Sequence, residues 1–256
     1  MSVPSVLLSR RERITLFLQR EVSRLTSWFW IPASTFTMRY LLGYRIQNAS
    51  SLRRRFRAMV RESNDPVLIC ANHLTMVDSA LVIWALGGTW WSVFNYRWVP
   101  WNLPETRNFA SGGISQLAIW LTKCMPIRRG GRRQDVSRVL HRVQHLLTRG
   151  DTALIFAEGG RSRTGRVQVD TVAHGMGRIA SSVAGCQALC VYLRGDRQRS
   201  WSALPVIGDS FYVDIDMFQP TSEGSGMRRS RDVARQIADR LAHMEEKYFA
   251  RRQRRS

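Results

Sequence analysis

The chain has 256 residues, and its 39 Lys and Arg residues against 19 Asp and Glu residues give a formal net charge of +20. This length fits one large domain or two small ones, and a content of 44% hydrophobic and 10% aromatic residues excludes global disorder. The 4 cysteines are scattered and form no CxxC pair, which excludes a disulfide scaffold, a zinc ribbon and a thioredoxin-type motif and favours reduced thiols in a cytoplasmic compartment. The net charge predicts a partner among nucleic acids, anionic lipid headgroups and small phosphorylated substrates.

The first predicted element is a basic amphipathic helix. From Arg10 to Trp30 apolar residues recur at helical spacing, while Arg13, Arg20 and Arg24 fall largely outside that stripe. A basic helix that ends in a Trp-Phe-Trp cluster is typical of a helix lying in a bilayer interface. The alternative is an ordinary surface helix whose apolar stripe faces the core. Further basic clusters are Arg53, Arg54, Arg55 and Arg57, and the tail Arg251, Arg252, Arg254 and Arg255.

Neither a signal peptide nor a membrane span is predicted. The arginines that begin at Arg10 follow the short apolar run at residues 1–8 rather than precede it, which is the wrong order for a signal peptide. The longest uncharged stretch, from Ser79 to Tyr96, has about the minimum length for a span. Because it contains Gly87-Gly88 and directly follows a polar motif, we expect a buried helix there.

After Arg61 short apolar runs alternate with helical stretches, a pattern that predicts an α/β fold with a mainly parallel central sheet flanked by helices. Strands are expected at Val67–Cys70, Met125–Ile127, Ala153–Phe156 and Ala188–Leu193, with a half-buried edge strand at Phe211–Ile215. Helices are expected around Val136–Leu147, ending at Gly150, at Thr171–Ala184 and at Val233–Tyr248. The predicted division is an N-terminal helical membrane-association segment at residues 1–60 and an α/β domain with a C-terminal amphipathic helix and a basic tail at residues 61–256.

A polar motif, Asn72-His73-Leu74-Thr75-Met76-Val77-Asp78, follows the first of these strands. The carboxyl ends of parallel strands are where ligands bind, which makes His73 a candidate general base. If His73 lies in the loop and Asp78 in the first turn of the next helix, Asp78 accepts a hydrogen bond from one imidazole nitrogen and leaves the other free to take a proton. The alternative is a helix cap, because Thr75 and Asp78 have the spacing of a capping-box variant.

A second polar segment, Phe156-Ala157-Glu158-Gly159-Gly160-Arg161-Ser162-Arg163-Thr164-Gly165, follows another strand. The two glycines allow close backbone approach, and the arginines and Ser162 are donors for an anion. Glu158 is expected to hold an arginine in place or to contact a substrate hydroxyl. The segment is neither a Walker loop nor a dinucleotide fingerprint, and an ordinary polar loop is the alternative. A third strand end adds Arg128 and Arg129 at the same edge of the sheet.

Together, Asn72-His73-x4-Asp78 and Glu158-Gly159-x-Arg161-Ser162 resemble the glycerolipid acyltransferase family, over roughly Pro66 to Gly195. The resemblance implies an α/β fold, peripheral membrane attachment through N-terminal helices, and acyl transfer from a thioester to a lipid hydroxyl. It implies that His73 is the general base and that Asp78 orients it. The implied substrate-binding residues are Arg129, Glu158, Gly159, Gly160, Arg161 and Ser162.

The family resemblance predicts that an acyl group passes from acyl-CoA or acyl carrier protein to the hydroxyl of a lysophospholipid such as lysophosphatidic acid. Departures from the family pattern at Arg128, Ala157, Gly160 and Cys190 leave the base intact and concern the acceptor. They favour, as an alternative, a different lyso-lipid such as a lyso-aminolipid. No cofactor is expected, and the expected location is peripheral, at the cytoplasmic face of an anionic membrane surface.

Two other classes of protein stay open at this point, a basic nucleic-acid-binding protein and a non-catalytic membrane-binding protein. No zinc-finger, RNP-type, GXXG or basic-zipper pattern is present, so no nucleic-acid partner is expected. His141 and His145 lie four residues apart, but Arg142 stands where a zincin motif needs Glu. No metal site is therefore predicted.

Overall fold

The structure is a computed structural model that describes residues 8–106, 112–128, 130–160, 162, 164–169, 172 and 174–254. Within these residues one six-stranded sheet has the order β1-β6-β5-β2-β4-β3. The strands are β1 (Arg45–Ile46), β2 (Val67–Ala71), β3 (Trp101–Asn102), β4 (Ala153–Phe156), β5 (Gln187–Gly195) and β6 (Ser210–Phe218). Neighbouring strands run parallel except β5 and β6, which are antiparallel. The predicted α/β fold with a mainly parallel sheet is confirmed.

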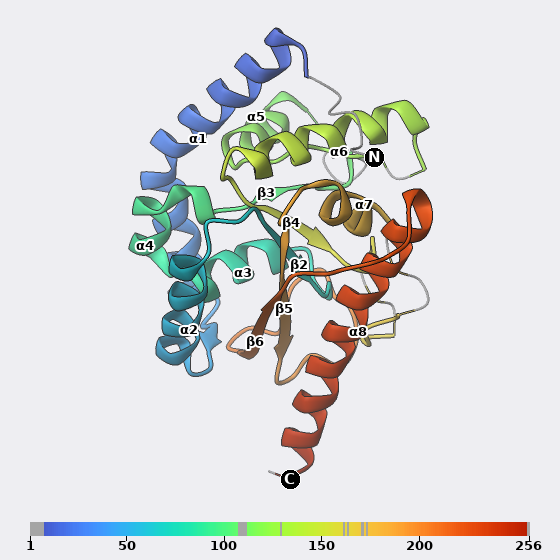
Figure 1. The fold of residues 1–256 in the computed structure, drawn as a ribbon. Helices are drawn as coiled ribbons and strands as arrows, with labels where there is room; N and C mark the ends of the chain where they lie inside the picture. The colour runs from blue at the N-terminus through green and yellow to red at the C-terminus, as the bar shows by residue number, and fades with distance from the viewer. Residues whose placement is uncertain are drawn as a thin grey trace.

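Helices cover both faces of the sheet (Figure 1). They are α1 (Arg10–Phe36), α2 (Ala49–Glu62), α3 (Asp78–Leu86), α4 (Thr89–Phe94), α5 (Gly113–Leu121), α6 (Arg133–Thr148), α7 (His174–Ser182) and α8 (Gly226–Gln253), with a π-helical turn η1 (Thr37–Leu41) and a 3-10 turn η2 (Tyr96–Trp98). The central strand β2 is buried along its whole length, as expected for a strand covered on both faces. Its alternate residues enter different cores: Leu68 packs in the core that includes α6, α7 and α8, and Ile69 in the core that includes α2 and α3.

Three predicted elements differ from the structure. The predicted edge strand Phe211–Ile215 belongs to β6, which lies between β1 and β5 rather than at the edge of the sheet. In place of the predicted strand at Met125–Ile127, the described residues form only two isolated bridges, Cys124 with Asn102 and Ile127 with Glu105. The reason is that Pro104 and Pro126 lack the N–H that a continuous ladder needs. The uncharged stretch from Ser79 to Tyr96 forms two short helices instead of one, because Gly88 ends the first with a φ of 72°. No helix in the described part of the chain is both long and apolar enough to cross a membrane.

Helix α1 docks on the domain through polar side chains rather than through its apolar stripe. Gln19 and Ser23 are buried: the Gln19 amide donates to the carbonyls of Trp120 (3.1 Å) and Cys124 (3.0 Å), and the Ser23 hydroxyl donates to the carbonyl of Leu121 at 2.6 Å. These bonds satisfy carbonyls at the C-terminal end of α5, which have no partner within their own helix. The N-terminus of α1 is closed by a capping box between Ser9 and Glu12.

The predicted apolar stripe of α1 faces outward. Phe29 is 79% exposed and Leu25 66% exposed, and Ile14, Phe17, Leu18 and Trp28 are exposed as well. The alternative in which this stripe faces the core is therefore wrong. Trp28 packs against Trp90 and Phe94 of α4, with ring centroids 6.4 Å and 5.3 Å apart, while Leu25 and Phe29 stay exposed. The amphipathic helix therefore presents most of its apolar stripe to the surroundings.

Candidate active site

The loop after β2 is anchored by the first residue of the polar motif. The buried Asn72 amide donates to the Leu193 carbonyl at 2.9 Å, and its oxygen accepts from the Leu193 N–H at 2.8 Å. These two bonds continue the pairing of β2 with β5 beyond the point where β2 ends. The loop that carries His73 therefore starts from a fixed position at the carboxyl edge of the sheet.

His73 and Asp78 meet as predicted. His73 Nδ1 lies 3.0 Å from Asp78 Oδ2, and Asp78 is 2% exposed in the first turn of α3. The same carboxylate accepts hydrogen bonds from the N–H groups of Leu74 (2.6 Å) and Thr75 (2.8 Å) and from the Thr75 hydroxyl (2.5 Å). With these donors converging on it, the Asp78 carboxylate is suited to accept a hydrogen bond from Nδ1–H of His73, an arrangement that would leave Nε2 free.

The capping-box alternative is not formed. The residue before α3 is Val77, which makes no side-chain cap bond, and the Thr75 hydroxyl donates to Asp78 instead of accepting from the helix. Asp78 still gains from its place at a helix N-terminus, where negative charge is favourable. Its side chain is turned back onto the preceding loop, so it fixes the loop rather than the helix end.

The plane of the His73 ring is fixed by Phe156 at the end of β4. The two rings are stacked, with centroids 3.9 Å apart and an interplanar angle of 12°. Phe156 pairs with Ala71 in the register between β4 and β2, so neighbouring strand ends deliver both rings. The imidazole is thus held on one face by an aromatic ring and at Nδ1 by a carboxylate.

The second polar segment lies against the first. The Ser162 N–H donates to the His73 carbonyl at 2.9 Å, and Ser162 is 3% exposed. Gly159 has a φ of 59° and donates its N–H to the Phe156 carbonyl at 3.0 Å, which makes the tight turn that the two glycines predict. The structure thus brings Glu158, Gly159, Gly160 and Ser162 into the loop beside His73.

Glu158 is partly buried next to this pair of loops. Burial raises its pKa to about 7, against the lowering effects of Ser162 and of the His73 backbone. Its Oε1 atom is buried and has no hydrogen-bond partner in the described part of the chain. Arg129, Arg161 and Arg163 lie outside the described residues, so the expected contact of Glu158 with an arginine stays a prediction. A carboxyl group with a pKa of about 7 and an oxygen without a hydrogen-bond partner is suited to bind a hydroxyl or an ammonium group of a ligand.

A cavity of about 360 Å³ opens beside His73 and Phe156. Its opposite wall is built from the segment at residues 102–105 and from α5. A second cavity of about 230 Å³ shares Ser79, Asn102, Thr122 and Cys124 with the first and extends to Trp30 and Ile31 of α1. The sequence does not predict this wall, because the two-residue strand β3 is too short to show a period and α5 carries no polar motif.

Metal-ligand residues do not gather in the described part of the chain: no group of three or more His, Cys, Asp or Glu side chains is placed to hold an ion. His141 and His145 lie on α6 beside arginines, and burial together with those arginines lowers the pKa of each imidazole.

A family model described as Acyltransferase matches residues 44–207, a span that includes both polar segments and well over half of the chain. The chain belongs to the Acyltransferase family. This membership confirms the resemblance to the glycerolipid acyltransferases and the prediction of an O-acyltransferase enzyme. Among solved structures, the acyltransferase is similar to the 1-acyl-sn-glycerophosphate (LPA) acyltransferase PlsC from Thermotoga maritima, with a TM-score of 0.47 and 15% sequence identity over 94% of this chain and 85% of that chain. A comparison of this chain with curated proteins found no match.

Proposed function

We propose that the protein transfers a fatty acyl group from an acyl thioester, acyl-CoA or acyl carrier protein, to the hydroxyl of a lysophospholipid such as lysophosphatidic acid. The observation that carries the proposal is the contact of 3.0 Å between His73 Nδ1 and Asp78 Oδ2, with His73 lining a cavity of about 360 Å³. The family membership supports acyl transfer, and the resemblance supports a lyso-lipid acceptor.

In the proposed reaction His73 is the general base. Its Nε2 takes the proton of the acceptor hydroxyl as that oxygen attacks the thioester carbonyl, and Asp78 stabilises the imidazolium that forms. The tetrahedral intermediate then breaks its C–S bond, and the leaving thiolate takes the proton back from Nε2. No enzyme nucleophile takes part, because the acceptor oxygen bonds directly to the acyl carbon.

The two adjoining cavities, the one at His73 and the inner cavity that extends to α1, are the proposed path of the acyl chain. They share four lining residues, and the inner cavity is lined mainly by apolar side chains, among them Ile31, Met38, Ile83 and Trp84. An extended hydrocarbon chain entering at His73 reaches α1 along this path, where burial of each CH₂ group contributes about 0.8 kcal/mol.

The acceptor headgroup is proposed to bind at the loop of Glu158, Gly159, Gly160, Arg161 and Ser162, with Arg129 as a further phosphate ligand. The contact of Ser162 with the His73 backbone supports this placement, because it sets the loop beside the base. The free Oε1 atom of Glu158 favours a second candidate, an acceptor that presents an ammonium group, such as a lyso-aminolipid. The two acceptors differ in the charge that faces Glu158.

We further propose peripheral attachment to a membrane, on its cytoplasmic face, through the outward stripe of α1. A second exposed apolar segment supports this orientation: Trp201, Leu204 and Ile207 are 46%, 54% and 69% exposed. Their loop is bonded to the catalytic loop, since the Ser202 N–H donates to the Leu74 carbonyl at 3.0 Å and the Met76 N–H to the Ala203 carbonyl at 3.1 Å. A membrane that receives this loop lies next to His73, where a lyso-lipid has to arrive.

The test is acyl transfer from labelled acyl-CoA, and separately from acyl carrier protein, to a panel of lyso-lipids in detergent micelles. We expect His73→Ala to lower kcat by a factor of about 10² to 10⁴, the usual contribution of a general base. His174→Ala, which removes an exposed histidine at the start of α7, is the matched control and should leave kcat unchanged. Retention of most activity in His73→Ala ends the base assignment, and liposome binding without transfer to any lyso-lipid ends the catalytic proposal.

A further inference from the structure

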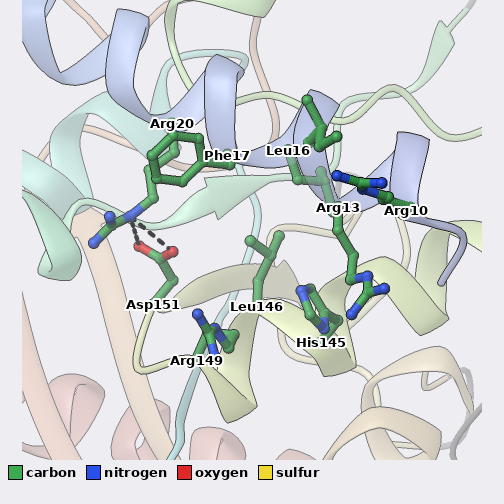
Figure 2. Close-up of a pocket in the computed structure, with 10 residues that line it drawn as sticks. Arg10, Arg13, Leu16, Phe17, Arg20, His145, Leu146, Arg149 and Asp151 are labelled. Atoms are coloured by element: carbon green, nitrogen blue, oxygen red, sulfur yellow. Dashed lines mark hydrogen bonds and ion pairs between the residues drawn. The ribbon is translucent and has the colours of Figure 1, made fainter. Parts of the chain in front are cut away.

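A third pocket lies away from His73, between the first turns of α1 and the C-terminal end of α6 (Figure 2). Its volume is about 560 Å³, within the range of about 300 to 1,000 Å³ that holds small ligands. None of its lining residues is shared with the cavity at His73. The pocket is therefore separate from the catalytic site.

Positive charge dominates the walls of this pocket. Arg10, Arg13, Arg20 and Arg149 line it, and the lining contains one carboxylate, Asp151. Asp151 is already engaged, because it accepts from Arg20 at 3.0 Å and from the buried Lys123 at 3.1 Å.

The other three guanidinium groups have no carboxylate partner in the described part of the chain. In Figure 2 the Arg13 side chain reaches to the ring of His145, and Arg149 lies between His145 and Asp151. Arginines that converge without acids are a ready set of donors for an anion, and their planar forks match phosphate oxygens. The positive charge of these three guanidinium groups is therefore suited to bind a phosphate group.

The pKa of His145 depends on these arginines. Burial, Arg149 and Arg13 all lower the pKa of its imidazole, so the ring is neutral at physiological pH and adds no further charge. A bound phosphate would oppose the arginines and raise this pKa. His145 thus provides a spectroscopic report on the occupancy of the pocket.

Hydrocarbon surface adjoins the arginines. Ile14 and Phe17 line the pocket and are 48% and 59% exposed, and they lead into the outward stripe of α1 that includes Leu18 and Leu25. A ligand that satisfies both features carries a phosphate and an apolar chain in the same molecule. An anionic phospholipid has this chemistry, and a soluble phosphate has only half of it.

We propose that the pocket formed by Arg10, Arg13, Arg20, His145 and Arg149 binds the phosphate of an anionic phospholipid whose acyl chains lie along the outward stripe of α1. This site deepens the proposed membrane attachment and rests on it, but it does not depend on acyl transfer. It converts general attraction to a negative surface into a specific grip at one end of α1.

The test compares Arg13→Ala/Arg149→Ala with the matched control Arg228→Ala/Arg229→Ala, which removes the same charge from exposed positions of α8. Sedimentation is measured with vesicles of phosphatidylcholine alone and of equimolar phosphatidylcholine and phosphatidylglycerol. At about 1 kcal/mol for each arginine near an anionic surface, the pocket variant should bind the mixed vesicles about 30-fold more weakly. The control pair should change binding by less than about threefold, since charges beyond a Debye length of about 10 Å are screened.

The source of the phosphate is decided by NMR of the His145 ring. Inorganic phosphate should move this resonance and raise its pKa in the wild type and not in the pocket variant. Equal loss of vesicle binding in both double variants overturns the proposal, because it shows general charge attraction. A His145 response to phosphate with unchanged vesicle binding overturns the lipid assignment in favour of a soluble phosphate. Acyl transfer is not part of any readout, so failure here and failure of the proposed reaction are distinguishable.

Discussion

Asp78→Asn tests the central geometric argument, because it preserves the size of the side chain and removes its charge. In the wild type Asp78 accepts from His73 Nδ1, from two backbone N–H groups and from the Thr75 hydroxyl. In the variant the amide has one oxygen that can accept hydrogen bonds. Its NH₂ group, itself a donor, faces donor groups that the second carboxylate oxygen accepted from. The Nδ1–H tautomer of His73 then loses the partner that selects it.

The expected magnitude follows from the contact distance. A full charge pair at 3.0 Å in a medium with an effective dielectric constant of about 20 has a Coulomb energy of about 5 kcal/mol, which is an upper limit on how far Asp78 stabilises the imidazolium. General-base catalysis as a whole contributes about 10² to 10⁴ in rate. We therefore expect kcat to fall by about 10³, with the KM of the acyl donor little changed.

The assay measures kcat and KM with the best lyso-lipid of the panel, together with urea unfolding. Because Asp78 acts on the imidazole rather than on a substrate, the loss should appear in kcat. Thr75→Val is the control, since it removes one donor to Asp78 and keeps the His73 contact. If Asp78→Asn loses activity only in proportion to its loss of folded protein, Asp78 is only a structural anchor and the mechanism argued from it is refuted.

Three further outcomes are expected. With a folded-state pKa of about 7, Glu158 holds a proton in the native state that the unfolded chain has already released, so the free energy of unfolding should decline by about 3 kcal/mol between roughly pH 4.5 and 7. Glu158→Gln should remove this decline. Denaturant unfolding at about pH 5 and pH 8 measures it, and an equal change of unfolding free energy with pH in both proteins would contradict the prediction. Lys123→Met should lower the unfolding free energy by about 3 to 5 kcal/mol, because it leaves the buried Asp151 with Arg20 as its one remaining ion-pair partner among the described residues. The double variant Lys123→Met/Asp151→Asn should recover part of that loss, and absence of any recovery would mean that Lys123 and Asp151 are not coupled. Ile83→Trp should fill the inner cavity and shift donor preference to shorter acyl chains in a competition assay, whereas an unchanged preference would place the chain elsewhere.

The parts of the fold that were predictable are those encoded by local pattern. Ala153–Phe156 matches β4 residue for residue, because a four-residue apolar run is bounded by polar residues on one side and a polar loop on the other. His73 and Asp78 were predictable as a pair because a strand end, a loop and a helix start are enough to bring them together. The strands β1 and β3 have two residues each and carry no period, so only the completed sheet defines them.

The parts that were not predictable depend on contacts distant in sequence. The orphaned oxygen of Glu158 and the wall of the catalytic cavity at residues 102–105 arise from packing between separate segments. The Met125–Ile127 segment shows the same limit, since Pro126 within it and Pro104 in its partner segment together decide whether an extended run becomes a strand. The charge balance of the basic pocket likewise appears only when α1 lies against α6.

Helix α1 connects these separate features. Its polar residues Gln19 and Ser23 satisfy carbonyls at the end of α5, and α5 in turn forms a wall of the catalytic cavity. Its later turns line the inner cavity with Trp30 and Ile31, and its first turns carry the arginines of the basic pocket. Deleting α1 therefore uncaps α5 and opens the acyl path as well as removing the apolar stripe. The buried side of α1 combines polar Gln19 and Ser23 with apolar Leu16 and Ile31. Hydrogen bonds and core packing together therefore hold the helix in the domain, which leaves its exposed apolar stripe available to lipid.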